Sequence, residues 1–526
     1  MKKSIFLLCL LTICTTSCDK DFGDINTNQL QPTTVDYEAI FNGLTESLQL
    51  GWNRQLFFHN EILYDVTELG AVTAKTFGNV DAGAEEIWGN YYNALKNARE
   101  LKSNLTVLSE LDPEVGDIVS AQIDILMAYK TFQVMDFFGD IPYEEAARAF
   151  DTEDILRPKY DDAREVYLSL LTQLREASDF LLDANVTSDG NPYLRVGSSG
   201  DALFDDNKLR WIKFSNSMLL RYLVRIYDKE PALVSTEIQS MIQNGYEFLN
   251  PGEDIVMSPA DQGWSNLGVN WSFREHNKVR MGSTMWDFMT DNDQALDPRL
   301  MIFFETNNDN EWRPFPQIPP DNVLQSGGAP YDQSIRDNVH SNKGAGNIYS
   351  PVNFYLIRDE RNIPEILISA AEIKFLLSEI FLRGIGVAKD ESIASFRYQE
   401  GMLASMEFWQ NIVTGSSIWE NRPPLLSTGE IFQVTEHPKY KFVVGATEDE
   451  NLAKIYAQRW VDAFRQPWEA FSILRQTDLL PLARSDNEFY RFAYPNSESV
   501  FNFESWSEQT ASMGGDLNNI KMWWMN

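Results

Sequence analysis

The chain of 526 residues carries a formal net charge of −33, and 43% of its residues are hydrophobic. An acid excess of this size repels phosphate backbones and excludes nucleic-acid binding, while the hydrophobic fraction excludes a disordered chain. Beyond the N-terminal segment, no stretch approaches about 18 consecutive apolar residues. The body is therefore expected to be soluble and tethered only at its N-terminus.

The N-terminal segment predicts a secretory signal of the lipoprotein type. A short basic head precedes an apolar run over 5–13, which is too short to span a bilayer, and small residues lead to Cys18. Cleavage before Cys18 would remove the signal peptide 1–17 and leave a thiol without a cysteine partner, at the position where a bacterial lipoprotein carries its lipid. Residues 18–34 are then a lipidated tether. Ordinary secretion with a leftover cysteine is the alternative.

Apolar residues spaced three and four apart predict a mostly α-helical chain. The spacing predicts helices over 118–135, 163–181, 211–222, 366–380, 396–412 and 452–471. Gly139 follows the first of these, and the fourth has Pro364 in its first turn and Gly384 just past its end. No repeat of fixed period is visible, although paired helices could still stack as a solenoid.

Residues 250–350 differ from the helical segments in composition. They are rich in Asn, Asp, Gly, Pro and aromatic residues and have few periodic apolar runs. Further irregular regions are 60–90, 415–450 and 483–526. Because long loops in compact proteins are usually functional, we expect a ligand site in these regions.

Seven segments along the chain form a series of motifs. The first four are DINTN at 24–28, DFFGDIPYEEA at 136–146, WIKFSNS at 211–217 followed by Leu220 and Arg221, and DPRL at 297–300. The fifth is a predicted helix with Glu372, Glu379 and Gly384. The last two are the segment 455–477, which contains Gln458, Trp460, Glu469 and Arg475, and the stretch 494–524. In this order they resemble the SusD/RagB family of outer-membrane nutrient-binding lipoproteins of Bacteroidetes. Gln29 stands where that family commonly has proline, and Met525 where it has aspartate.

The resemblance implies a single SusD-like domain over 35–526, with a loop-rich insertion at about 250–350. Its fold would be mostly α, with tetratricopeptide-like helix pairs forming a helical scaffold and long irregular loops binding the ligand. The implied function is that of a cell-surface lipoprotein that captures oligosaccharides, or peptides, and delivers them to a SusC-like TonB-dependent transporter. Such a protein is anchored by lipid in the outer membrane and faces the cell exterior. It is not an enzyme and needs no cofactor.

The ligand site is expected to combine aromatic and planar polar side chains. Sugar rings pack their C–H faces on aromatic rings, and their hydroxyls form hydrogen bonds with amide, carboxylate and guanidinium groups. In the family, ligand contacts tend to come from the stretches 60–90 and 250–350. The expected ligand-binding residues are Trp264, Trp271, Trp312, Tyr331, Arg280, Phe77 and Asn79. Trp88 and Trp286 are flanked by apolar residues and are expected in the core.

Patterns that indicate catalysis or metal binding are missing from the sequence. The four histidines are isolated, which argues against a zinc site, and no nucleophile elbow or phosphate-binding loop occurs. Carboxylate pairs such as Asp291 and Asp293, or Glu144 and Glu145, are expected in turns and at the surface. Two alternatives stay open: an exported all-helical glycoside hydrolase, which would need two carboxylates across a cleft, and a helical-repeat scaffold that binds only protein.

Overall fold

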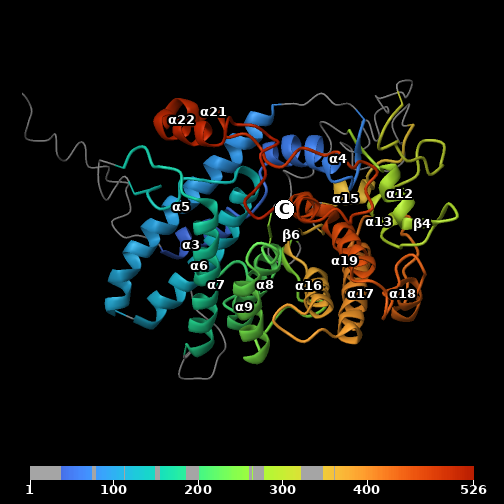
Figure 1. Ribbon diagram of the computed structural model, residues 1–526, viewed down its shortest axis with the longest axis horizontal. Helices are drawn as coiled ribbons and strands as arrows, with labels where there is room; N and C mark the ends of the chain where they lie inside the picture. Colours follow the sequence, from blue (N-terminus) through green and yellow to red (C-terminus); the bar gives the residue numbers. More distant parts are fainter. Residues whose placement is uncertain are drawn as a thin grey trace, which may run out of the picture.

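The computed structural model describes residues 37–73, 79–111, 113–148, 155–184, 201–259, 263–264, 278–320, 348–359 and 362–525. Most of these residues form helices, so the predicted mostly α-helical fold is confirmed. Figure 1 shows long helices side by side in the lower part of the view, with short helices and loops above them. None of the described helices has the length and apolar character needed to span a membrane.

Long helices that pack on their sequence neighbours build the scaffold. They are α5 (Val80–Leu111), α6 (Pro113–Phe138), α7 (Ala163–Asp183), α8 (Lys208–Arg225), α9 (Pro231–Gln243), α16 (Ala370–Arg383), α17 (Glu391–Gly415), α19 (Glu448–Asp462) and α20 (Pro467–Gln476). Each helix from α5 to α8 packs on the next, α16 packs on α17 and α19, and α8 joins the two groups through α16. The predicted scaffold of paired helices is therefore present.

Shorter elements lie in the connections. They are α3 (Tyr37–Glu46), the π-helix η1 (Arg54–Leu63), α4 (Tyr64–Val66), β1 (Ala71–Val72), β2 (Ile255–Met257), β3 (Val279–Arg280), α12 (Ser283–Met289), β4 (Thr290–Asp291), β5 (Gln294–Ala295), α13 (Leu300–Phe303), α15 (Phe354–Arg358), β6 (Glu365–Ile368), α18 (Thr428–Thr435), η2 (Ala463–Arg465), α21 (Asn496–Phe501) and α22 (Phe503–Ser512). The strands pair antiparallel as β1 with β3, β2 with β6, and β4 with β5. Trp88 and Trp286 are buried in two apolar cores, as predicted.

The fourth predicted helix begins later than expected. Residues Glu365–Ile368 form β6, and Ser369 then caps α16 by accepting the Glu372 N–H at 3.0 Å. Pro364 precedes a strand, so its predicted place in the first helical turn is wrong. A continuous apolar run suits a buried strand as well as a buried helix. Gly384 ends the helix at φ 73°, the left-handed conformation that favours glycine, as predicted.

The helix predicted over 452–471 is two helices. α19 ends at Asp462, η2 follows, and α20 starts at Pro467. Proline has no backbone N–H to donate inside a helix, but it suits the first turn of a new one. Both helices bury their apolar side chains, so the apolar spacing runs across the break and conceals it.

The regions predicted to be irregular contain helices. The end of η1, the whole of α4 and the first turns of α5 lie in 60–90, α18 lies in 415–450, and α21 and α22 lie in 483–526. The prediction is therefore wrong at these elements. Since α18, α21 and α22 have 8, 6 and 10 residues, they offer too few turns for an apolar period to be recognised.

A network of buried charges joins the scaffold helices. Arg225 on α8 pairs with Asp136 on α6 at 2.5 Å and with Glu469 on α20 at 2.8 Å. Arg221, one turn earlier on α8, pairs with Glu372 on α16. Burial alone would raise the pKa of the Glu469 carboxyl, but Arg225 and Arg221 hold it below its usual value. One network therefore fixes four scaffold helices against one another.

A second buried group ties the DPRL segment to the C-terminal half. Arg299 pairs with Asp297 at 2.6 Å, and it donates to Gln458 Oε1 at 2.6 Å and to Ser405 Oγ at 2.8 Å. Asp297, Arg299 and Gln458 belong to the motif segments, as do Asp136, Arg221, Glu372 and Glu469 of the first network, while Arg225 lies outside them. The motifs thus mark positions that hold the scaffold together.

Replacing Arg225 by methionine leaves the Asp136 and Glu469 carboxylates buried without their partner. We expect Arg225→Met to lower the free energy of unfolding by about 3–5 kcal/mol, measured by urea unfolding. Arg157→Met is the matched control, because Arg157 pairs with Glu504 at an exposed position across 3.8 Å. Exposed pairs contribute about 1 kcal/mol or less. Equal losses in the two variants would contradict the structural role of the network.

Candidate functional site

The two regions expected to bind the ligand meet at one edge of the fold. β1 pairs antiparallel with β3, and the Thr73 N–H donates to the Lys278 carbonyl at 3.0 Å. The Lys278 side chain also forms an ion pair with Glu61 on η1 at 3.0 Å. Residues 71–73, from the first expected region, are thereby held beside residues 278–280, from the second.

Two further segments extend this pairing into a small irregular layer. The Met281 N–H donates to the Ser350 carbonyl at 2.9 Å, and the Phe315 N–H donates to the Met281 carbonyl at 2.8 Å. Gln317 Nε2 donates to the Gly70 carbonyl at 3.2 Å. β1 follows α4, β3 precedes α12, and the segment with Ser350 precedes α15; Figure 1 shows these three helices in the same part of the view. Segments far apart in sequence thus support one surface.

Asn307 organises the turn that leads out of this layer. It is fully buried, and its Oδ1 accepts the backbone N–H groups of Asp309 and Glu311, both at 2.9 Å. Its Nδ2 donates to the Ile348 carbonyl at 3.0 Å. Asn310 adopts φ 60°, which asparagine tolerates better than most residues. Hydrogen bonds, more than apolar packing, therefore set the conformation of this turn.

Trp312 follows the turn as a half-buried aromatic ring. Its ring centroid lies 5.9 Å from that of the buried Trp286, at an interplanar angle of 33°. The polar residues that precede and follow it in the chain are exposed: Asp309, Asn310, Glu311 and Arg313. We call Trp312 and these four side chains the Trp312 face.

The Trp312 face has the chemistry that a sugar requires. Packing on Trp286 fixes one side of the Trp312 ring, so the ring is ordered before a ligand arrives. The Arg313 guanidinium lies 5.6 Å from the ring centroid of Tyr349, which restrains it as well. A pyranose could place its C–H groups on the indole and share its hydroxyls among carboxylate, carboxamide and guanidinium groups.

The other predicted contacts that the structure describes lie outside this turn. Arg280 is fully buried in β3 and donates from Nη1 to the Val279 carbonyl at 3.0 Å. Asn79 is exposed, but its Oδ1 accepts the Ala82 N–H at 3.2 Å at the start of α5. Trp264 is half-buried against the first core, and its Nε1 is buried without a hydrogen-bond partner.

The remaining predicted positions lie outside the described residues. They are Cys18, Phe77, Trp271 and Tyr331. The predicted carboxylate pair Asp291 and Asp293 lies at the exposed turn between β4 and β5, as expected. Among the described residues, no group of histidine, cysteine and carboxylate side chains is arranged to hold a metal ion.

Sequence analysis missed the residues that shape the face. Asn307 was not singled out, although asparagine followed by Asn308, Asp309 and Asn310 is a strong turn signal. The pairing of Lys278 with Glu61 joins residues far apart in the chain, so no local pattern could have indicated it.

A second opening lies among residues of the C-terminal part. This cavity has a volume of about 690 Å³ and is lined by Asp228, Arg383, Tyr456 and residues of the stretch 474–490, Tyr490 among them. Its size admits a sugar, so it competes with the Trp312 face as a ligand site.

Comparison with protein-family models matches residues 32–495 to a SusD-like family described as starch-binding and associating with the outer membrane. Comparison with curated proteins finds no match. Among solved structures, a chitin-binding protein superposes with a TM-score of 0.71 at 22% identity, covering 93% of this chain and 100% of that one.

Two other solved structures share the same fold. A SusD homologue of Bacteroides fragilis has a TM-score of 0.69 at 20% identity, with 93% of this chain and 100% of that one covered. A SusD-like protein of Bacteroidetes has a TM-score of 0.67 at 18% identity, with 94% and 100% covered. At these identities the likeness establishes the arrangement of the helices and leaves the ligand open.

Proposed function

We propose that this chain, which belongs to the SusD-like family of starch-binding proteins that associate with the outer membrane, captures oligosaccharides at the Trp312 face. SusD-like proteins are binding proteins and not enzymes. The observation that carries the proposal is the half-buried Trp312 ring, fixed on Trp286 and flanked by exposed polar side chains. Such a surface offers a sugar ring both an apolar face to pack on and polar groups for its hydroxyls.

Carbohydrate is favoured over peptide by two observations. The family description names starch, and one structural neighbour is named for binding chitin; both are polysaccharides built of pyranose rings. The Trp312 face offers one flat ring among planar polar groups, which suits the alternating apolar and hydroxyl surfaces of a pyranose. Peptides are retained as one arm of the test.

Calorimetric titration of the chain lacking residues 1–18 tests this proposal. The ligands are malto-oligosaccharides, chito-oligosaccharides and short peptides, each recovered afterwards and sized. We expect heat with an oligosaccharide that is recovered intact, and a loss of affinity of about tenfold or more in Trp312→Ala, equivalent to about 1.4 kcal/mol. Shortened ligand would contradict capture without cleavage, and heat with peptides alone would contradict the ligand class.

Two control variants locate the binding. Trp52→Ala removes a tryptophan that is 38% exposed on another part of the chain, and we expect it to leave affinity unchanged. Tyr490→Ala changes the cavity of the C-terminal part. Loss of binding in Tyr490→Ala with normal binding in Trp312→Ala would move the ligand site to that cavity.

The N-terminal segment supports a proposal for where in the cell the protein is held. We propose a lipoprotein signal over 1–17, lipid on Cys18, a tether over 18–34 and one domain over 35–526, exposed on the outer face of the outer membrane. The support is Cys18, the last of the three cysteines, which follows a short apolar run and small residues, together with a family that associates with the outer membrane. An anchored binding protein needs a route for its cargo, and we propose a SusC-like TonB-dependent transporter as its partner.

Affinity purification of the tagged chain from outer membranes tests the anchor and the partner together. We expect the wild-type chain to incorporate a fatty-acid label and to co-purify with a large transporter, because the lipid holds it at the membrane. Cys18→Ala should lose the label and leave the membrane fraction. An unlabelled wild-type chain would contradict lipidation, and a labelled chain purified alone would contradict the partnership.

A further inference from the structure

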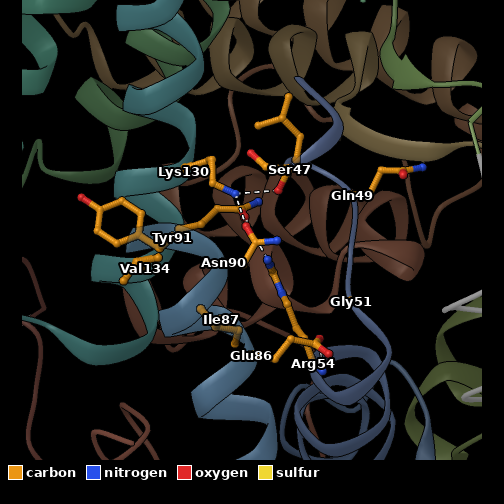
Figure 2. A pocket seen from close by; sticks show the side chains of 12 residues that line it. Ser47, Gln49, Gly51, Arg54, Glu86, Ile87, Asn90, Tyr91, Lys130 and Val134 are labelled. Carbon is orange, nitrogen blue, oxygen red and sulfur yellow. Dashed lines mark hydrogen bonds between the residues drawn. The ribbon is translucent and has the colours of Figure 1, made fainter. Parts of the chain in front are cut away.

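A small cavity lies between the segment after α3, the start of η1, and helices α5 and α6. Its lining residues are Ser47, Leu48, Gln49, Gly51, Arg54, Glu86, Ile87, Asn90, Tyr91, Lys130, Gln133 and Val134. Figure 2 shows Lys130 and Arg54 reaching toward Asn90 from different elements. The cavity volume is about 20 Å³, which is enough for one water or one monatomic ion and too small for a sugar.

Two cationic side chains in this cavity are buried without a contacting carboxylate. Lys130 is 7% exposed, and its Nζ donates to the Ser47 carbonyl at 2.6 Å and to Asn90 Oδ1 at 2.5 Å. Arg54 is 9% exposed, and its Nη1 donates to Gln133 Oε1 at 3.1 Å. Its Nη2 is buried and has no hydrogen-bond partner.

The carboxylates nearby are engaged elsewhere. Glu86 accepts the backbone N–H groups of Asn53 at 3.1 Å and Arg54 at 2.9 Å, at the start of η1. Glu365 accepts the Leu50 N–H at 3.1 Å, and burial raises the pKa of its carboxyl to about 7. Neither carboxylate contacts Lys130 Nζ or Arg54 Nη2, although Glu365 raises the pKa of both cations and Glu86 raises that of Arg54.

The nearby carboxylates compensate the two charges only in part, so the pKa of each cation stays below its usual value. Burial and the neighbouring Arg54 charge together lower the pKa of Lys130 to about 7. Burial also lowers the pKa of Arg54 to about 10. Buried charges of like sign are costly unless a counter-charge lies beside them. A water molecule could satisfy the hydrogen bonds, but it would not offset the charge.

We propose that this cavity binds one monatomic anion of the size of chloride, held by Lys130 Nζ and Arg54 Nη2. The unpartnered Nη2 group supplies a donor, Lys130 has a third N–H to give, and the volume excludes larger anions such as phosphate. The anion would fix η1, a type of helix that is rare and often lies at functional sites, against α5 and α6. Its role is to complete the buried charge balance of this part of the scaffold.

Crystals of the chain grown in sodium bromide test the site directly. We expect an anomalous peak in the cavity, within contact distance of Lys130 Nζ and Arg54 Nη2. In solution, the thermal unfolding midpoint should be at least about 1 °C higher in sodium chloride than in sodium gluconate of equal concentration, because an anion that binds only the folded chain stabilises it.

Variants separate a bound anion from a general salt effect. Lys130→Met should abolish the difference between the two salts. Lys102→Met is the control, because Lys102 pairs with Asp124 on the same two helices at 2.7 Å and should keep the difference. No bromide peak, or a peak with equal midpoints in both salts for the wild-type chain, would overturn the proposal. If Lys130→Met fails to fold, these two wild-type measurements still decide it.

Discussion

The buried ion pairs of α8 are the constraint on which the rest of the structure depends. Arg221 and Arg225 hold carboxylates from α16, α20 and α6, all in the interior. Helices that contact each other through apolar side chains tolerate small shifts in their packing. A buried charge is stable only beside an opposite charge. We infer that the network selects one register for these helices. Because the scaffold is set in this way, the connections are free to carry other functions.

The irregular layer is built from such connections. Its four segments are far apart in the chain and are joined by backbone hydrogen bonds, while their apolar side chains, such as Val279, Met281 and Phe315, are buried below the surface. Asn307 fixes the turn from within, and Trp312 rests on Trp286. The result is a rigid support for exposed polar groups, which lowers the entropy lost when a ligand binds.

Sequence patterns predicted the scaffold better than the site. Helical spacing located α6, α7, α8, α16 and α17, since their apolar stripes repeat over several turns. It did not locate α5 or α9, and it could not distinguish the strand Glu365–Ile368 from a helical turn or detect the break at Pro467. Residue type alone placed Arg280 and Trp312 together as ligand contacts. In the structure Arg280 is buried and Trp312 is half-exposed. The difference arises because segments far apart in the chain pair with each other, and no local sequence pattern indicates that pairing.

Hydrogen–deuterium exchange on the chain lacking residues 1–18, with and without a bound oligosaccharide, tests the central claim most directly. Amides that a ligand covers or orders exchange more slowly, so the method locates the binding surface along the chain. The account predicts slower exchange in peptides covering 305–317 and no change in peptides covering 474–490. Protection confined to 474–490 would place the ligand in the C-terminal cavity and contradict binding at the Trp312 face.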